Sequence, residues 1–182
     1  MTTYVAMLRG INVSGRNTLS MDDLRAVIVD AGGTDVRTYI QSGNAVFRSR
    51  SSSSAVEKAL ESRLHGALGT RIPVLVRTRD ELGGVMGANP FVLRGEDPKL
   101  LHVTFLDASP DPSVAAAARA KAADSDEHQV IGREVYLFCP NGYGRTTLTN
   151  TFFERRFDRQ ATTRNWRTVT TLVEMAGGPT DP

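Results

Sequence analysis

Four short polar stretches contain the residues that could bind a ligand. They are residues 10–17, 41–44, 141–147 and 161–166, and three of them include an arginine. Each combines glycine or a predicted helix start with hydrogen-bonding side chains, and such loops leave backbone N–H groups that favour an anion. The candidate ligand-binding residues are Arg9, Asn12, Arg16, Gln41, Ser42, Asn44, Arg145, Thr163, Arg164 and Asn165. We expect the four stretches to converge on one pocket between two halves of the chain.

The stretch at residues 10–17 has the glycine spacing of a phosphate loop. Arg16 and Asn17 stand where that loop needs its lysine and its magnesium-binding serine or threonine. The next helix is predicted to begin only at Ser20, too late for its N–H groups to face a phosphate. The sequence therefore disfavours nucleotide hydrolysis here. A flexible glycine turn and a binding loop that presents Asn12 and Arg16 beside Arg9 remain as alternatives.

The stretches at residues 41–44 and 141–147 are each open to two interpretations. In the first, glycine and asparagine suffice for a turn, whereas Gln41 and Ser42 add polar groups at the strand end. The second lies between a predicted strand and a predicted helix, so its glycines can bring backbone N–H groups close to an anion that Arg145 neutralises. A glycine turn followed by a threonine cap explains the second stretch equally well.

The stretch ATTRNW at residues 161–166 precedes the last predicted helix. Trp166 lies on an apolar stripe that continues at positions 169, 172, 173 and 176, so it is predicted to anchor the core. Thr163 or Asn165 can cap this helix. A helix start leaves Arg164 without an explanation, and we therefore include it among the ligand-binding candidates.

Positive charge is concentrated near the C-terminus, although the net charge of the chain is only +2. Residues 145–167 hold six arginines against Glu154 and Asp158. Such a segment supports nucleic-acid binding as an alternative function. Against it, RNA-recognition sheets need stacking aromatics, and the third predicted strand offers only Asn-Ala-Val-Phe at residues 44–47.

Other chemistry has no recognisable residues in this sequence. His65, His102 and His128 have no partner at a metal-ligand spacing, so no metal site is predicted. Motifs for a serine nucleophile and for a dinucleotide are absent, and no cofactor or catalytic residue is assigned. Cys139 lies in an apolar run and is predicted to be a buried, inert thiol. An enzyme of unknown reaction, with residues gathered from several loops, is the second alternative.

Composition indicates an ordinary globular protein. The chain has 182 residues, of which 40% are hydrophobic and 23% charged. No apolar run approaches the roughly 18 residues that a membrane span needs. We expect a cytoplasmic protein that binds a small anionic ligand, with phosphorylated compounds and nucleotides as the candidate classes; the sequence leaves the identity of the ligand and the oligomeric state open.

The first half of the sequence predicts a ferredoxin-like subdomain, residues 1–80. Ser20 and Asp23 form a capping box, and Gly32 and Gly33 end the helix that follows. The predicted elements are a strand at 3–9, a helix from 20, strands at 36–41 and 45–48, a helix at 56–68 and a strand at 72–76. This is the order βαββαβ. In the first and the fourth predicted strands, both sets of alternate residues are largely apolar. We therefore expect both faces of the sheet to be covered.

The second half, residues 81–182, predicts a smaller α+β subdomain packed against the first. Its predicted elements are a helix at 80–86, a connection at 87–98, a strand at 100–106, a helix at 112–123, a hairpin within 130–138 and helices at 147–157 and 166–176. The fold class is therefore α+β with two subdomains.

Six sequence blocks together resemble a bacterial family called domain of unknown function 1697. The blocks are MLRGINVSGRN, TYIQSGNAVF, NPF, KLLHVTFL, NGYGRTTLTNTFFERRF and ATTRNWRTV, spread from residue 7 to residue 169. The resemblance implies two α+β subdomains, the first ferredoxin-like. It brings no established activity to this chain.

Overall fold

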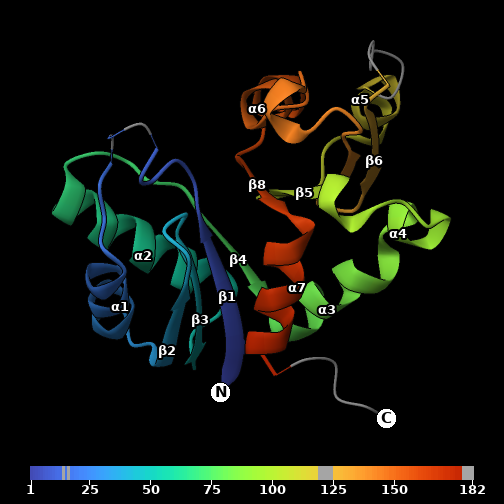
Figure 1. The fold of residues 1–182 in the computed structure, drawn as a ribbon. Helices are drawn as coiled ribbons and strands as arrows, with labels where there is room; N and C mark the ends of the chain where they lie inside the picture. The colour runs from blue at the N-terminus through green and yellow to red at the C-terminus, as the bar shows by residue number, and fades with distance from the viewer. Residues whose placement is uncertain (14, 16, 119–124, 178–182) are drawn as a thin grey trace. The chain divides into compact units, whose positions relative to one another are not determined.

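The computed structural model describes residues 1–13, 15, 17–118 and 125–177, which form two compact units (Figure 1). The first unit consists of Met1–Gly83 with Thr171–Pro182, and the second of Gly84–Thr170. The main division falls between Gly83 and Gly84, whereas the sequence analysis placed its boundary after residue 80. The C-terminal segment, which the sequence analysis assigned to the second subdomain, groups with the first unit.

The first unit is built around a four-stranded antiparallel sheet. Its elements are β1 (Thr2–Leu8), α1 (Met21–Asp30), β2 (Thr34–Tyr39), β3 (Asn44–Ser49), α2 (Ser53–Leu68) and β4 (Val74–Thr78). The strand order is β2-β3-β1-β4, with β1 antiparallel to both of its neighbours. This element order and this sheet order confirm the predicted ferredoxin-like arrangement.

Local sequence signals explain where the two helices of this unit begin. The Asp23 N–H donates to Ser20 Oγ over 3.0 Å, as the capping box predicts, and Ser52 caps α2 in the same way. Both helices lie on one face of the sheet (Figure 1) and pack their apolar stripes on it. The residues of β1 on the other face, Val5 and Met7, are also fully buried, so both faces are covered as predicted.

The second unit repeats the same topology. Its elements are α4 (Pro90–Arg94), η1 (Pro98–Leu100), β5 (Leu101–Leu106), α5 (Pro112–Ala118), β6 (Glu127–Ile131), β7 (Glu134–Phe138), η3 (Tyr143–Arg145), α6 (Asn150–Phe157) and β8 (Ala161–Asn165). The strand order is β6-β7-β5-β8, and all neighbours are antiparallel. The chain therefore contains two ferredoxin-like units where the sequence identified one.

Several predicted boundaries in this half need correction. Residues 161–165 form an edge strand, which the sequence analysis treated as the approach to a helix. The segment has no apolar alternation of its own, and pairing with β5 along its whole length makes it a strand. The predicted connection at 87–98 contains α4, which starts because Asn89 Oδ1 accepts the Phe91 N–H and Pro90 occupies the first turn. α6 begins at Asn150 rather than 147, after its cap Thr149.

The two units also agree in detail at their last strands. Arg77 of β4 and Arg164 of β8 each pair with a valine of the central strand, at the same register position. The next residues, Thr78 and Asn165, each accept a backbone N–H of a following helix. These helices are α3 (Arg79–Ala88) and α7 (Trp166–Met175), and each begins in one unit and ends in the other.

Candidate functional site

Two of the four predicted stretches come together in the first unit. Asn12 Nδ2 donates to the carbonyl oxygens of Gln41, at 2.7 Å, and Leu19, at 2.8 Å, while the Leu19 N–H donates to Asn12 Oδ1 at 2.9 Å. Gly43 has a φ of +79°, and a Cβ there would lie 2.6 Å from Ile11 Cδ1. The turn therefore needs glycine both for its backbone conformation and for close packing against the loop.

The asparagine side chains of this cluster donate hydrogen bonds to other groups of the chain. Asn17 Nδ2 donates to the Gly10 carbonyl, and the buried Asn44 donates to the Tyr39 carbonyl and to Ser42 Oγ. Asn12 and Asn17 both have positive φ, 53° and 49°, which asparagine tolerates better than most residues. Asn12 and Asn44 thus hold the loop and the turn in place.

The remaining candidates of the first unit differ in their exposure. Gln41 and Ser42 are exposed, and Arg9 is half-buried, with its backbone N–H donating to the Pro73 carbonyl. Arg16 lies outside the described residues. α1 begins at Met21, so the loop does not lead directly into a helix, which agrees with the argument against a phosphate loop.

Strand alternation divides the ATTRNW stretch between the two faces of the second sheet. Thr162 and Arg164 share one face, and Arg164 Nη1 donates to Thr162 Oγ1 at 2.7 Å and to the Thr163 carbonyl at 2.9 Å. Arg164 is only 7% exposed. The arginine left unexplained by the sequence is therefore a buried residue that bonds to its own strand.

Thr163 and Asn165 project from the face that α5 and α6 cover. The Thr163 hydroxyl lies 2.7 Å from Asn150 Oδ1, to which it donates, and 2.7 Å from the buried Thr104 Oγ1. Asn165 caps α7 by accepting the Thr168 N–H at 2.8 Å. Asn165, the last residue of β8, therefore also starts α7, and the buried Trp166 that follows anchors the core as predicted.

The stretch at residues 141–147 contacts β5 through a pair of stacked rings. Gly142 has a φ of 85°, and the single turn of η3 follows it. The Tyr143 ring stacks on the His102 ring with 4.6 Å between centroids and an interplanar angle of 22°. His102 in turn pairs with Asn165 across β5 and β8. The exposed Arg145 ends the same η3 turn, two residues after Tyr143.

Sequence reasoning did not assign His102 or Tyr143 to a site. They are 41 positions apart in the sequence, and only the packing of the β7–α6 connection against β5 brings them together. Burial lowers the pKa of His102, an effect that the Leu100 carbonyl partly opposes. His102 is therefore neutral near pH 7 and can donate or accept a hydrogen bond without adding charge.

Cys139 is buried, as predicted. Burial, with a contribution from Asp126, raises the pKa of its thiol to about 11, although a hydrogen bond with Thr146 acts in the opposite direction. Such a thiol is protonated and unreactive near neutral pH.

The four predicted stretches thus form two clusters, one in each unit. The convergence of all four on one pocket stays a prediction. Among residues 1–13, 15, 17–118 and 125–177, no three histidine, cysteine, aspartate or glutamate side chains are grouped as metal ligands would be. The helices described there are also too short or too polar to cross a bilayer.

The fold and the clusters define this protein as a tandem of two ferredoxin-like units with polar loops at the sheet ends. The chain belongs to the family described as "Protein of unknown function (DUF1697)", whose model matches residues 1–136. The structure described as that of conserved bacterial protein SP0830 from Streptococcus pneumoniae is similar, with a TM-score of 0.76 and 22% identity over 96% of this chain and 98% of that chain. This identity supports the shared fold alone. No curated protein matches the sequence.

Proposed function

We propose that the protein binds a small anionic ligand, and that Arg145, Asn165, His102 and Tyr143 form one contact region for it. The observation that carries the proposal is that the Tyr143 ring stacks on His102, which pairs with Asn165 across β5 and β8, so that three separate segments come together at one end of the second sheet. Arg145 supplies an exposed positive charge there. Since the Asn165 oxygen caps α7, its side-chain N–H groups can donate to an anion.

Phosphate or carboxylate is the group that best fits such a region. A guanidinium binds either group through charge-assisted hydrogen bonds, and loss of one such bond costs about 1.5 to 3 kcal/mol.

The test is a thermal-shift measurement with inorganic phosphate and with nucleoside mono-, di- and triphosphates. Arg145→Ala removes the proposed cation, and Arg50→Ala, which removes an exposed arginine from the β3–α2 connection, is the matched control. The ligand-induced rise in melting temperature should shrink in Arg145→Ala, corresponding to roughly 10- to 100-fold weaker binding. If no anion stabilises the wild type, or if both variants respond equally, the proposal is wrong.

Arg164→Ala is a poor test of ligand binding. Because Arg164 is buried and bonded to Thr162 and to the Thr163 carbonyl, its removal changes the stability of the strand itself. A reduced ligand response in that variant would not separate binding from folding.

Nucleic-acid binding is the second candidate, and one surface of α6 favours it. A pocket of about 420 Å³ there is lined by Thr149, Thr151, Phe152, Arg155 and Arg156. Both arginines are exposed beside a half-buried aromatic ring, an arrangement that suits a phosphate backbone and a stacked base. The sheet face used by RNA-recognition modules does not suit this role, since Val5, Met7 and Val46 on it are buried.

Fluorescence anisotropy with mixed-sequence single-stranded RNA and DNA tests this second function. Affinity should fall steeply as salt increases, because phosphate contacts release counterions. The double variant Arg155→Gln/Arg156→Gln should reduce the salt slope. Absence of binding at low salt would eliminate nucleic acid as a partner.

A further inference from the structure

In the two sheets that the structure describes, three of the four edges are blocked by features of the fold. At β4, the Val74 and Val76 N–H groups donate to the carboxylates of Glu61 and Glu57, over 3.1 and 2.9 Å. These glutamates lie four residues apart on α2, so they face the strand together. An outward N–H that already has an acceptor cannot pair with another chain.

The equivalent edge of the second unit uses this device at one position, where the Ala161 N–H of β8 donates to Glu154 of α6. Asn150, four residues earlier on α6, accepts the side-chain hydroxyl of Thr163, so α6 is also held against this edge strand. The β2 edge is blocked differently. Its register shifts between Thr34 and Arg37, and the Arg37 side chain donates to the Met175 carbonyl. A bulge of this kind disrupts the row of groups that a new strand would need.

The β6 edge has a regular backbone. Its five residues pair with β7 without a register shift, and β6 is the edge strand of the sheet among the described residues. Ile131 and Glu134 flank a two-residue turn and form a hydrogen-bonded pair, so Val130 directs its N–H and C=O away from β7. In the described part of the chain, no hydrogen bond to the Val130 backbone comes from the far side of β6.

A pocket flanks β6 on each side of the sheet. On the α5 side, a pocket of about 360 Å³ is lined by Pro110, Pro112, Ala115, Ala116 and Val130, among others. On the α4 side, a pocket of about 710 Å³ is lined by residues including Phe91, Arg94, Asp126, Glu127 and Gln129. Figure 1 shows both helices beside this edge strand. Successive residues of a strand point to opposite faces, so a strand added here would direct alternate side chains into the two pockets.

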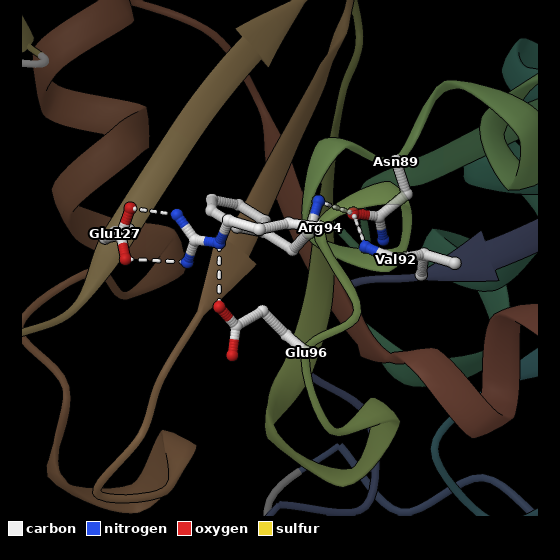
Figure 2. A network of polar contacts seen from close by, with 6 residues as sticks. Asn89, Val92, Arg94, Glu96 and Glu127 are labelled. Carbon is white, nitrogen blue, oxygen red and sulfur yellow. Dashed lines mark hydrogen bonds and ion pairs between the residues drawn. The ribbon is translucent and has the colours of Figure 1, made fainter.

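The charges around the α4-side pocket select a basic side chain. Arg94 makes a bidentate pair with Glu127, both distances 2.8 Å, and a third bond to Glu96 at 2.7 Å (Figure 2). Its guanidinium also lies over the Phe91 ring, 5.0 Å from the centroid. Two carboxylates, Asp126 and Glu127, line the pocket against one arginine, which is already engaged, so the pocket lining carries a net negative charge. The α5-side pocket instead has mostly small apolar lining residues, with Ser109 and His128 as its polar ones.

We propose that an extended segment of a partner protein adds to the second sheet beside β6. Its main chain pairs with the outward N–H and C=O of Val130. A lysine or arginine enters the acidic pocket beside Asp126 and Glu127, and a neighbouring small apolar residue enters the pocket lined by Pro110, Pro112 and the alanines of α5. The partner sequence is therefore an alternating one, with a basic residue next to an apolar one.

The experiment selects binders from a phage-displayed library of random nine-residue peptides on the full-length protein. Peptides that alternate basic and small apolar residues should be enriched. The strongest peptide is then labelled, and its affinity is measured by fluorescence anisotropy for the wild type, Val130→Pro and Asp126→Lys. Asp30→Lys, at the exposed C-terminal end of α1, is the matched charge control.

Asp126→Lys should weaken the peptide about threefold or more, and Asp30→Lys should leave its affinity within twofold. Val130→Pro removes the outward N–H and should weaken binding about fivefold or more. If that variant does not fold, the same loss is expected when the peptide amides that face β6 are N-methylated. The proposal is overturned if the enriched peptides do not alternate basic and small apolar residues. It is also overturned if neither Asp126→Lys nor N-methylation of the peptide changes the affinity. Self-association of the wild type that Val130→Pro abolishes would also overturn it, by showing a second copy as the occupant.

Discussion

Asn12 is the residue whose replacement should most disturb the loop cluster of the first unit. Its amide group makes three hydrogen bonds, two with Leu19 and one with the Gln41 carbonyl. The two bonds with Leu19 are partly buried, and that to Gln41 is exposed. At about 1 kcal/mol for each partly buried bond and about 0.5 kcal/mol for the exposed one, their loss costs about 2.5 kcal/mol.

The backbone of Asn12 adds a second cost. Its φ of 53° lies in the left-handed region, where alanine is less favourable by about 1 kcal/mol. Asn12→Ala should therefore lower the free energy of unfolding by about 3.5 kcal/mol. Asn17→Ala is the matched control, because Asn17 has a φ of 49° in the same loop but one side-chain hydrogen bond, to the Gly10 carbonyl. Its expected loss is about 2 kcal/mol.

Urea unfolding followed by far-UV circular dichroism measures both losses. With a slope of about 2 kcal/mol per molar urea, the midpoint should fall by about 1.7 M for Asn12→Ala and about 1 M for Asn17→Ala. The slopes themselves should stay unchanged. An equal or smaller fall for Asn12→Ala would refute the inference that this one amide holds the loop to the turn.

Three further predictions concern the second unit. Thr163→Val should destabilise the protein by about 1 to 3 kcal/mol in urea unfolding, because Thr104 and Asn150 lose their shared partner; the double variant with Thr104→Val should cost less than the sum of the single changes. The Cys139 thiol, with its raised pKa, should react with iodoacetamide at pH 8 only when urea unfolds the protein, and rapid reaction of the native form would contradict its burial. Burial lowers the pKa of His102 in the folded protein below the value of about 6.5 that it has in the unfolded chain. As the pH falls from 7.5 to 5, the unfolded chain therefore binds more protons than the folded protein, and the free energy of unfolding should fall. The measurement is the melting temperature across this pH range, and its fall should be smaller in His102→Phe than in the wild type. An unchanged pH dependence in the variant would show that other groups cause the fall.

The sequence determined most of the first unit by itself. Its helices have short, strong signals, such as the Ser20 cap and the apolar stripe of α2, and its hairpin is specified by Gly43 and the polar residues around it. These signals act between residues close in sequence, so they are readable without knowledge of the fold. The burial of Cys139 and the helix start at Asn165 were readable for the same reason.

The tertiary structure decided the second unit and the roles of the polar residues. β8 is a strand because β5 offers it a partner, which no pattern within residues 161–165 reveals. Once it is a strand, its alternation buries Arg164 on one face and sends Thr163 and Asn165 to the other, so three residues grouped by sequence are separated in space. Conversely, His102 joins Tyr143, and Asn12 joins Gln41, only because distant segments pack together. Local propensity acts along the chain, whereas a binding surface depends on which strands become neighbours, and long-range pairing alone determines that.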